Sequence, residues 1–324
     1  MIMNSSTPFQ HISSRGVDIH HHFLPFFFVE ALTQSGHPVA AQAKALAWSP
    51  EKSLVMMDEA GIETSILSLS LPGASFTRAA DPPALARRCN EYAAQMIADY
   101  PGRFGAFASI PVLNVEAAFE EVEHALDRLK LDGVMLLTNV RGRYLGEADF
   151  DPVLEELNRR KAVVFLHPNW APSPGFNDFV EFPHEVTRAL ASLTASGGIE
   201  RYNRIRYILA YGGGTIPFIA SRVTVVMMDV FGSFLKTMVR YLIRLRTMQR
   251  MNYDLTASMD RYAWLALYGH TKPSRIMMGS NFPWSSPSTF AQQQAELRAV
   301  VELDPSWIES IERDNSLKLF PRFA

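Results

Sequence analysis

Short apolar runs alternate along the chain with longer stretches in which apolar residues recur every three or four positions. The short runs lack the polar alternation of half-exposed strands, a pattern typical of parallel strands buried on both faces. Eight runs are predicted as strands: Val17–Ile19, Thr64–Ser68, Phe104–Ile110, Gly133–Leu137, Ala162–Leu166, Arg206–Ala210, Tyr253–Leu255 and Arg275–Gly279.

Helices are predicted between these strands. Ser49, Pro50 and Glu51 read as an N-cap, a first-turn proline and an acidic first turn of a helix that stops at Gly61. Asn114 is expected to cap a second helix. Further helices are predicted at Pro83–Tyr100, Pro152–Arg160, Glu185–Ala195, Met259–Tyr268 and Phe290–Val301. Strands and helices alternating over 324 residues predict the α/β class, with one (β/α)8 TIM-barrel domain spanning residues 1–324.

Two segments are longer than a barrel requires, residues 23–60 and residues 215–250. The second contains the apolar stretches Val223–Val230 and Phe234–Leu245, together with three arginines, Arg240, Arg244 and Arg246. One interpretation is an amphipathic helix on the outside of the barrel. The other is a substrate lid or a dimer contact, because large apolar patches attract partners.

Composition narrows the possible classes of function. The net charge of −2 gives no electrostatic reason to expect nucleic acid or an anionic membrane as a partner. The only cysteine is Cys89, which excludes a disulfide within the chain and a cysteine-based zinc site. No window reaches the ~20 apolar residues that span a bilayer, and the first residues lack an export signal. We therefore expect a cytoplasmic protein.

Candidate chemistry begins directly after the first predicted strand, in the run His20-His21-His22. Alternate residues of a strand share a face, so His20 and His22 are expected to point into the barrel mouth and His21 away from it. His167 ends the fifth strand, and active sites of this fold gather at the carboxyl ends of strands. The three imidazoles suit zinc and related cations. The alternatives are a surface histidine cluster and a satisfied core histidine.

Four motifs resemble the amidohydrolase superfamily, and within it the branch that includes aminocarboxymuconate-semialdehyde decarboxylase and hydroxybenzoate-type decarboxylases. They are Asp18–Pro25, Phe165–Pro168, Tyr211–Phe218 and Gly279–Trp284. The resemblance covers nearly the whole chain. It implies one divalent metal on His20, His22 and His167, with zinc expected first and manganese next. It also implies homodimers and a carboxylic acid substrate.

Two positions depart from the family pattern. Tyr211 stands where the family has a proton-transferring histidine, and Asn281 stands where it has a metal-binding aspartate. An asparagine carries no charge and is no base near neutral pH. A tyrosine, with an ordinary pKa near 10, is a hydrogen-bond donor or general acid rather than a base. Both changes remove the usual means of activating water, so hydrolysis is disfavoured and the site could also work without a metal.

Further residues are candidates for contact with a substrate. His184 is a possible replacement acid, or else a surface histidine at a helix start. Arg188 could bind a substrate carboxylate, or else form a structural ion pair. Asn139 lies in a loop after the fourth strand that either holds substrate or is solvated. Trp170 and Trp284 could stack on an aromatic ring or pack in the core.

Three functions follow from these residues. The first is a metal-dependent carbon–carbon lyase, a non-oxidative decarboxylase of a small aromatic or unsaturated carboxylic acid, in which Tyr211 supplies or orients a proton. The second is a metal-free cyclase or dehydratase of secondary metabolism on the same barrel, using Tyr211, Asn281 and the histidines. The third is a degenerate barrel that binds a ligand without turnover.

Overall fold

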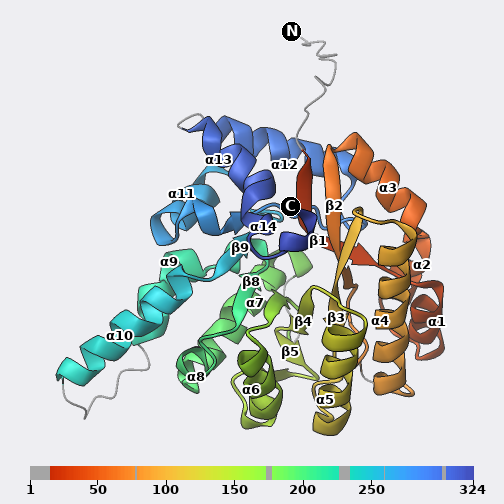
Figure 1. The fold of residues 1–324 in the computed structure, drawn as a ribbon. Helices are drawn as coiled ribbons and strands as arrows, with labels where there is room; N and C mark the ends of the chain where they lie inside the picture. Colours follow the sequence, from red (N-terminus) through yellow and green to blue (C-terminus); the bar gives the residue numbers. More distant parts are fainter. Residues whose placement is uncertain (1–14, 77–78, 173–176, 226–233, 259, 301–303) are drawn as a thin grey trace.

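Eight parallel strands form one sheet that wraps into a barrel (Figure 1). The computed structural model describes residues 15–324 except 77–78, 173–176, 226–233, 259 and 301–303. All eight predicted strands are present, in the neighbour order β1-β2-β3-β4-β7-β8-β9-β10. Their bounds are β1 Gly16–Phe23, β2 Ile62–Leu69, β3 Phe104–Ser109, β4 Gly133–Leu137, β7 Val163–His167, β8 Arg206–Leu209, β9 Asn252–Asp254 and β10 Ile276–Met277.

Main-chain hydrogen bonds join the first strand to the segment that follows the last one. The Ile19 N–H donates to Met278 O at 3.1 Å, and the His22 N–H donates to Phe282 O at 2.7 Å. These bonds continue the parallel pairing past the end of β10. The barrel is therefore nearly closed, and the carboxyl ends of β1 and β10 lie side by side.

Aromatic rings fill the barrel along its axis. Phe320, near the C-terminus, contacts Phe107 with ring centroids 5.8 Å apart, and Phe107 stacks on Phe165 at 5.3 Å. Phe165 in turn lies edge-on to His20 at 5.0 Å. Nearly every strand residue is buried, as the unbroken apolar runs predict. The interior is thus a packed core that supports the histidines from below.

Helices cover the outside of the barrel and mostly match the predictions. Ser49 and Asn114 cap α3 and α5 through their side chains, as expected. The bounds are α1 Phe26–Gln34, α2 Ala40–Leu46, α3 Pro50–Glu59, α4 Pro82–Asp99, α5 Val115–Glu123, α6 Asp151–Arg160, α7 Asp178–Ala195, α8 Gly198–Arg201, α9 Ile216–Val225, α10 Phe234–Gln249, α11 Arg261–His270, α12 Pro287–Val300, α13 Pro305–Glu309 and α14 Asn315–Leu317. No helix of the described residues is long and apolar enough to cross a bilayer.

Two local predictions need correction. Helix α7 begins at Asp178, well before the predicted Glu185, because the Asn177 side chain caps it and the helix continues through Pro183. The loop after β4 contains a small hairpin, in which β5 (Asn139–Val140) pairs with β6 (Arg143–Tyr144). Its two turn residues both have positive φ, 52° for Arg141 and 81° for Gly142, as a tight hairpin requires.

The two long segments contain helices. Residues 23–60 form α1, α2 and α3, and residues 215–250 include α9 and α10; part of the apolar stretch Val223–Val230 lies outside the described residues. Helix α10 projects away from the barrel (Figure 1). A simple amphipathic helix would bury its apolar residues and expose its charged ones. In α10, Arg244 is instead buried and pairs with Glu200 at 2.5 Å, while Leu242 and Ile243 are exposed.

A tight turn of three glycines follows β8 and carries the chain from Tyr211 to α9. Gly212, Gly213 and Gly214 all have positive φ, at 62°, 77° and 65°. A Cβ atom on Gly214 would overlap the carbonyl oxygen of Pro183 and lie 2.7 Å from Thr187 Oγ1. The run is therefore required by both the backbone conformation and the close approach of α7.

We predict that Gly214→Ala lowers the free energy of unfolding by at least about 3 kcal/mol, because backbone strain at a positive φ and overpacking add. Gly36→Ala is the matched control, since Gly36 has a φ of 66° with nothing within 4 Å of an added Cβ. It should cost only about 1–2 kcal/mol of strain. Urea unfolding of both variants measures the difference, and equal losses would contradict the packing constraint.

Candidate active site

Three histidines meet at the carboxyl ends of β1 and β7. The Nε2 atom of His20 lies 3.1 Å from that of His22 and 3.2 Å from that of His167. All three potential ligand atoms lie within 4.8 Å of one another, and all three side chains are buried. The three histidines predicted as metal ligands therefore lie together. The strand pleat turns His20 and His22 to the same side.

Each of these rings is held through its other nitrogen. Nδ1 of His20 lies 2.8 Å from Asp254 Oδ2, and Nδ1 of His22 lies 2.9 Å from Ser68 Oγ. Nδ1 of His167 donates to the carbonyl oxygen of Pro168 at 2.8 Å. Acceptors at Nδ1 favour the tautomer whose Nε2 lone pair is free. The three lone pairs can therefore face one common point.

His21 turns the other way, as strand alternation predicts. Its Nδ1 lies 2.9 Å from Asp18 Oδ2 and its Nε2 lies 2.9 Å from Ser53 Oγ. Asp18 also accepts from the N–H of His20 at 3.0 Å, and from the N–H and hydroxyl of Ser280 at 2.9 and 2.6 Å. One buried carboxylate thus fixes the middle histidine and ties β1 to the segment after β10.

Burial sets the protonation of the cluster. It lowers the pKa of His22 well below its usual value, and the neighbouring His167 and His20 lower it further. Burial, followed by the charge of His20, also lowers the pKa of His167. A charged imidazolium is disfavoured where water is excluded and a second cation would lie beside it. Both rings are therefore neutral near pH 7, which is the form that binds metal ions.

The donor set fits a divalent metal ion. Two nitrogens that each lie about 2.0–2.1 Å from a tetrahedral zinc ion are about 3.3 Å apart, close to the 3.1 Å and 3.2 Å that separate Nε2 of His20 from those of His22 and His167. Acceptor groups at the far nitrogen are also usual for metal-binding histidines. Asn281, the fourth position of the family pattern, is half-buried, and its N–H donates to His20 O at 2.8 Å.

Asp254 is a site residue that the sequence reasoning missed. It ends β9, and besides the His20 ring it accepts from the N–H of Tyr211 at 3.2 Å and of Thr256 at 2.8 Å. It therefore fixes His20 and the turn that carries Tyr211 at the same time. A signal was available, since an acid at the carboxyl end of a buried strand follows the same rule that pointed to His167.

Tyr211 lies beside the cluster, with its ring 5.7 Å from that of His20 and nearly perpendicular to it. It is buried, and its backbone has a positive φ of 54°. Burial raises the pKa of its phenol, with Asp254 and Asp178 adding to the shift. The phenol therefore keeps its proton near neutral pH and can act as a donor, not as a base.

Aromatic side chains lead from Tyr211 toward the loops. Phe182 of α7 lies 6.3 Å from the Tyr211 ring and 6.4 Å from Trp170, measured between ring centroids. Trp170 also lies 5.6 Å from His37, which comes from the segment 23–60. Sequence reasoning did not identify Phe182 or His37, because only the folded chain brings them near. Trp284 donates through Nε1 to Ser70 Oγ at 2.8 Å.

Asn139 and Arg188 meet at a buried carboxylate, Glu185. Asn139 Nδ2 donates to Glu185 Oε2 at 2.8 Å, and Arg188 donates to Glu185 Oε1 at 2.7 Å. The Tyr144 hydroxyl donates to the same Oε1 at 2.9 Å. Arg188 also pairs with Glu181 at 3.1 Å. These contacts match a structural ion pair for Arg188 rather than a contact with a substrate carboxylate. Asn139 holds the β5–β6 hairpin against α7.

His184 is not brought to the histidine cluster by any contact in the described structure. Its side chain is exposed on α7, and its Nδ1 lies 2.6 Å from the carbonyl oxygen of Val180 on the same helix. An exposed imidazole bonded to its own helix is not aimed at the Nε2 atoms. The structure therefore favours the surface alternative for this residue over the role of replacement acid.

A parallel eight-stranded barrel with convergent histidines at its carboxyl end defines the class of metal-binding barrel enzymes. The amidohydrolase family model matches residues 17–322, and the chain belongs to this family.

The chain is 36% identical to decarboxylase yanB of Aspergillus niger, over 95% of this chain and 88% of that protein. It is 32% identical to the 6-methylsalicylic acid decarboxylase acuB of Aspergillus aculeatus, over 94% and 96%. These relatives confirm the expectation of a carbon–carbon lyase.

A solved structure shares the fold. The dihydroxybenzoic acid decarboxylase of Polaromonas sp. JS666, with bound manganese and the inhibitor 2-nitroresorcinol, superposes with a TM-score of 0.77 at 19% identity. The match covers 94% of this chain and 96% of that one. It confirms the barrel architecture that the alternation of strands and helices predicts.

Proposed function

We propose that this enzyme decarboxylates a small hydroxylated aromatic acid of the 6-methylsalicylic acid type, using a divalent metal on His20, His22 and His167. The observation that carries the proposal is the convergence of three Nε2 atoms, each ring fixed from behind at Nδ1. Imidazole donors favour zinc, and manganese is the alternative because the Polaromonas relative holds it.

The chemistry requires a proton on the ring carbon that bears the carboxylate. The bond between that carbon and the carboxylate then breaks, its electron pair returns to the ring, and CO2 leaves. A bound divalent cation would supply positive charge for the carboxylate and an adjacent hydroxyl oxygen. No oxidant or reductant is needed, and no water has to be activated.

Tyr211 serves this reaction as a fixed donor. Because burial raises the pKa of its phenol, forming a phenolate is costly, and orienting a substrate oxygen or the incoming proton is the favoured role. Asp254 holds the Tyr211 main chain and the His20 ring in one hydrogen-bonded unit. Asn281, whose main-chain N–H donates to His20 O, carries an uncharged amide, which suits an anionic substrate better than a carboxylate would.

The loops supply the surface for an aromatic ring. Trp170 and Phe182 line the approach to Tyr211, and we assign Trp170 and Trp284 to contact with the substrate ring. Asn139 and Arg188 take part through Glu185, by fixing the hairpin and α7 around the mouth. His37 places the segment 23–60 over the same mouth, which supports a lid role for that segment.

We further propose that the enzyme is a cytoplasmic homodimer. On the outer half of α10, Met238, Val239 and Leu242 are 37%, 48% and 41% exposed, an apolar stripe suited to a second copy. The cytoplasmic assignment rests on the lone cysteine, Cys89, which is buried as a free thiol.

Metal removal provides the first test. Protein stripped with a chelator should lose at least about 100-fold of its rate of CO2 release from 6-methylsalicylic acid, and zinc or manganese should restore it. His167→Ala should resist restoration, whereas His184→Ala, which alters an exposed histidine, should respond like the unmodified chain. Full turnover by the stripped protein would refute the metal role and favour a metal-free enzyme.

Tyr211→Phe removes the phenol hydroxyl and keeps the aromatic ring, so it tests the hydroxyl alone. We expect kcat to fall about 100-fold, with metal content retained, because one positioned donor is lost while the packing stays. Tyr262→Phe is the control, since that residue is 82% exposed. An unchanged kcat in Tyr211→Phe would exclude the phenol from the reaction.

The dimer is tested by light scattering. The unmodified chain should have twice the mass of one chain, and Leu242→Glu should shift it toward the monomer by placing a charge in the apolar stripe. Val55→Glu serves as control, because Val55 is also exposed but lies on α3. A monomeric unmodified chain would contradict the proposal.

A further inference from the structure

A cavity opens at the opposite end of the barrel, away from the histidines. Its volume is about 580 Å³, within the range of small-molecule sites. Arg206 is the first residue of β8, Asn252 is the first of β9, and Arg275 directly precedes β10. Tyr211 and Asp254 lie at the other ends of β8 and β9. The cavity is therefore separate from the active site and does not depend on the proposed function.

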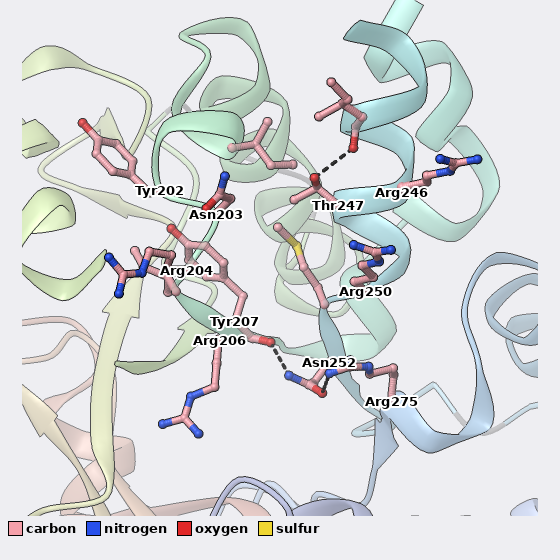
Figure 2. A pocket seen from close by; sticks show the side chains of 14 residues that line it. Tyr202, Asn203, Arg204, Arg206, Tyr207, Arg246, Thr247, Arg250, Asn252 and Arg275 are labelled. Atoms are coloured by element: carbon pink, nitrogen blue, oxygen red, sulfur yellow. Dashed lines mark hydrogen bonds between the residues drawn. The ribbon is translucent and has the colours of Figure 1, made fainter. Parts of the chain in front are cut away.

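The charged side chains around this cavity are all of one sign. Every charged residue that lines it is an arginine, namely Arg204, Arg206, Arg246, Arg250 and Arg275. Figure 2 shows Arg246 and Arg250 on one side of the hollow and Arg204 and Arg206 on the other. Guanidinium groups keep their charge at any physiological pH, so the cavity is strongly positive.

Nearby acids do not neutralise this charge. Within the part of the chain that the structure describes, none of the five arginines forms an ion pair with a carboxylate, although Arg244 pairs with Glu200 and Arg201 with Asp151. Arg206 donates instead to the carbonyl oxygen of Lys161 at 3.1 Å. All five arginines are exposed, so water and salt screen their mutual repulsion in part, and an anion between them would reduce it further.

The other lining groups suit a polar ligand. Asn203, Thr247 and Asn252 add amide and hydroxyl groups, and Tyr202 and Tyr207 add two aromatic rings (Figure 2). Asn252 is held in place by donating to Tyr207 O at 2.9 Å. Burial also lowers the pKa of Arg206, as expected for a cation that lacks a compensating carboxylate.

We propose that this cavity binds a small molecule carrying two or more phosphate groups. Guanidinium groups bind phosphate oxygens in pairs, and their planar forks match that geometry. Because the arginines stand on two sides of the hollow, a ligand with several phosphates engages more of them than a single phosphate does. The bound anion would bridge α10 to the amino-terminal ends of β8 and β9.

Calorimetric titration of the full chain with inorganic tripolyphosphate tests the site. We expect saturable binding at one site per chain, weakened as sodium chloride is raised, and a higher midpoint of thermal unfolding with ligand present. ADP and pyrophosphate are titrated in the same way. If ADP binds more tightly than pyrophosphate, the ligand is a nucleotide; if the two bind equally, only the phosphate groups are recognised.

Two double variants test whether tripolyphosphate binding requires this cavity or only the overall positive charge of the chain. Arg246→Ala/Arg250→Ala should weaken tripolyphosphate binding at least about tenfold, since charged hydrogen bonds are lost. Arg222→Ala/Arg261→Ala removes the same charge from exposed positions outside the cavity and should bind like the unmodified chain. If Arg246→Ala/Arg250→Ala does not fold, the single variant Arg250→Glu takes its place.

Three results would overturn the proposal. These are no binding of any phosphate compound at low salt, equal weakening in both double variants, and tighter binding of an acidic octapeptide than of tripolyphosphate. The last would identify a surface for an acidic protein segment instead. Decarboxylase activity is measured in parallel, and its presence or absence does not bear on these outcomes.

Discussion

The buried carboxylate of Asp18 is the contact on which both the fold and the site depend. It accepts hydrogen bonds from the N–H of His20, from Nδ1 of His21, and from the N–H and hydroxyl of Ser280. A buried charge is tolerated only when its lone pairs are satisfied in this way. The same four bonds join the first strand to the segment after the last one and turn His21 out of the mouth. That arrangement reinforces the strand pleat, which turns His20 and His22 toward His167.

A second buried carboxylate, Asp254, positions side chains on the other side of the barrel mouth. Asp254 joins the ring of His20 to the main chain of Tyr211, which occupies a positive φ that a bulky residue adopts only when it is held there. The close approach of Gly214 to Pro183 then sets where α7 lies, and with it Phe182. Each catalytic candidate is therefore positioned by a contact between segments distant in the chain, with the barrel as the common frame.

The sequence predicts what depends on local pattern. Unbroken apolar runs identify all eight strands, and strand alternation together with the strand-end rule identifies His20, His22 and His167. It fails where a contact between distant segments decides the outcome. Glu181 is recognisable as a second partner of Arg188 only once α7 is seen to begin at Asp178. Arg244 lies inward because Glu200 meets it there, and the five arginines come together only through the barrel.

Under the proposed function, the uncharged side chain of Asn281 would shape the electrostatics of the site. Imidazole ligands without an acidic partner would leave a divalent ion with its full charge, whereas an aspartate ligand would cancel part of it. The carboxylate of Asp254 would offset part of that charge through the ring of His20, to which it is hydrogen-bonded. A site of this kind would attract a carboxylate substrate strongly and would lack a base for water. On the proposed function, the uncharged Asn281 and the protonated phenol of Tyr211 would therefore act in the same direction, toward binding and polarising an organic acid rather than toward hydrolysis.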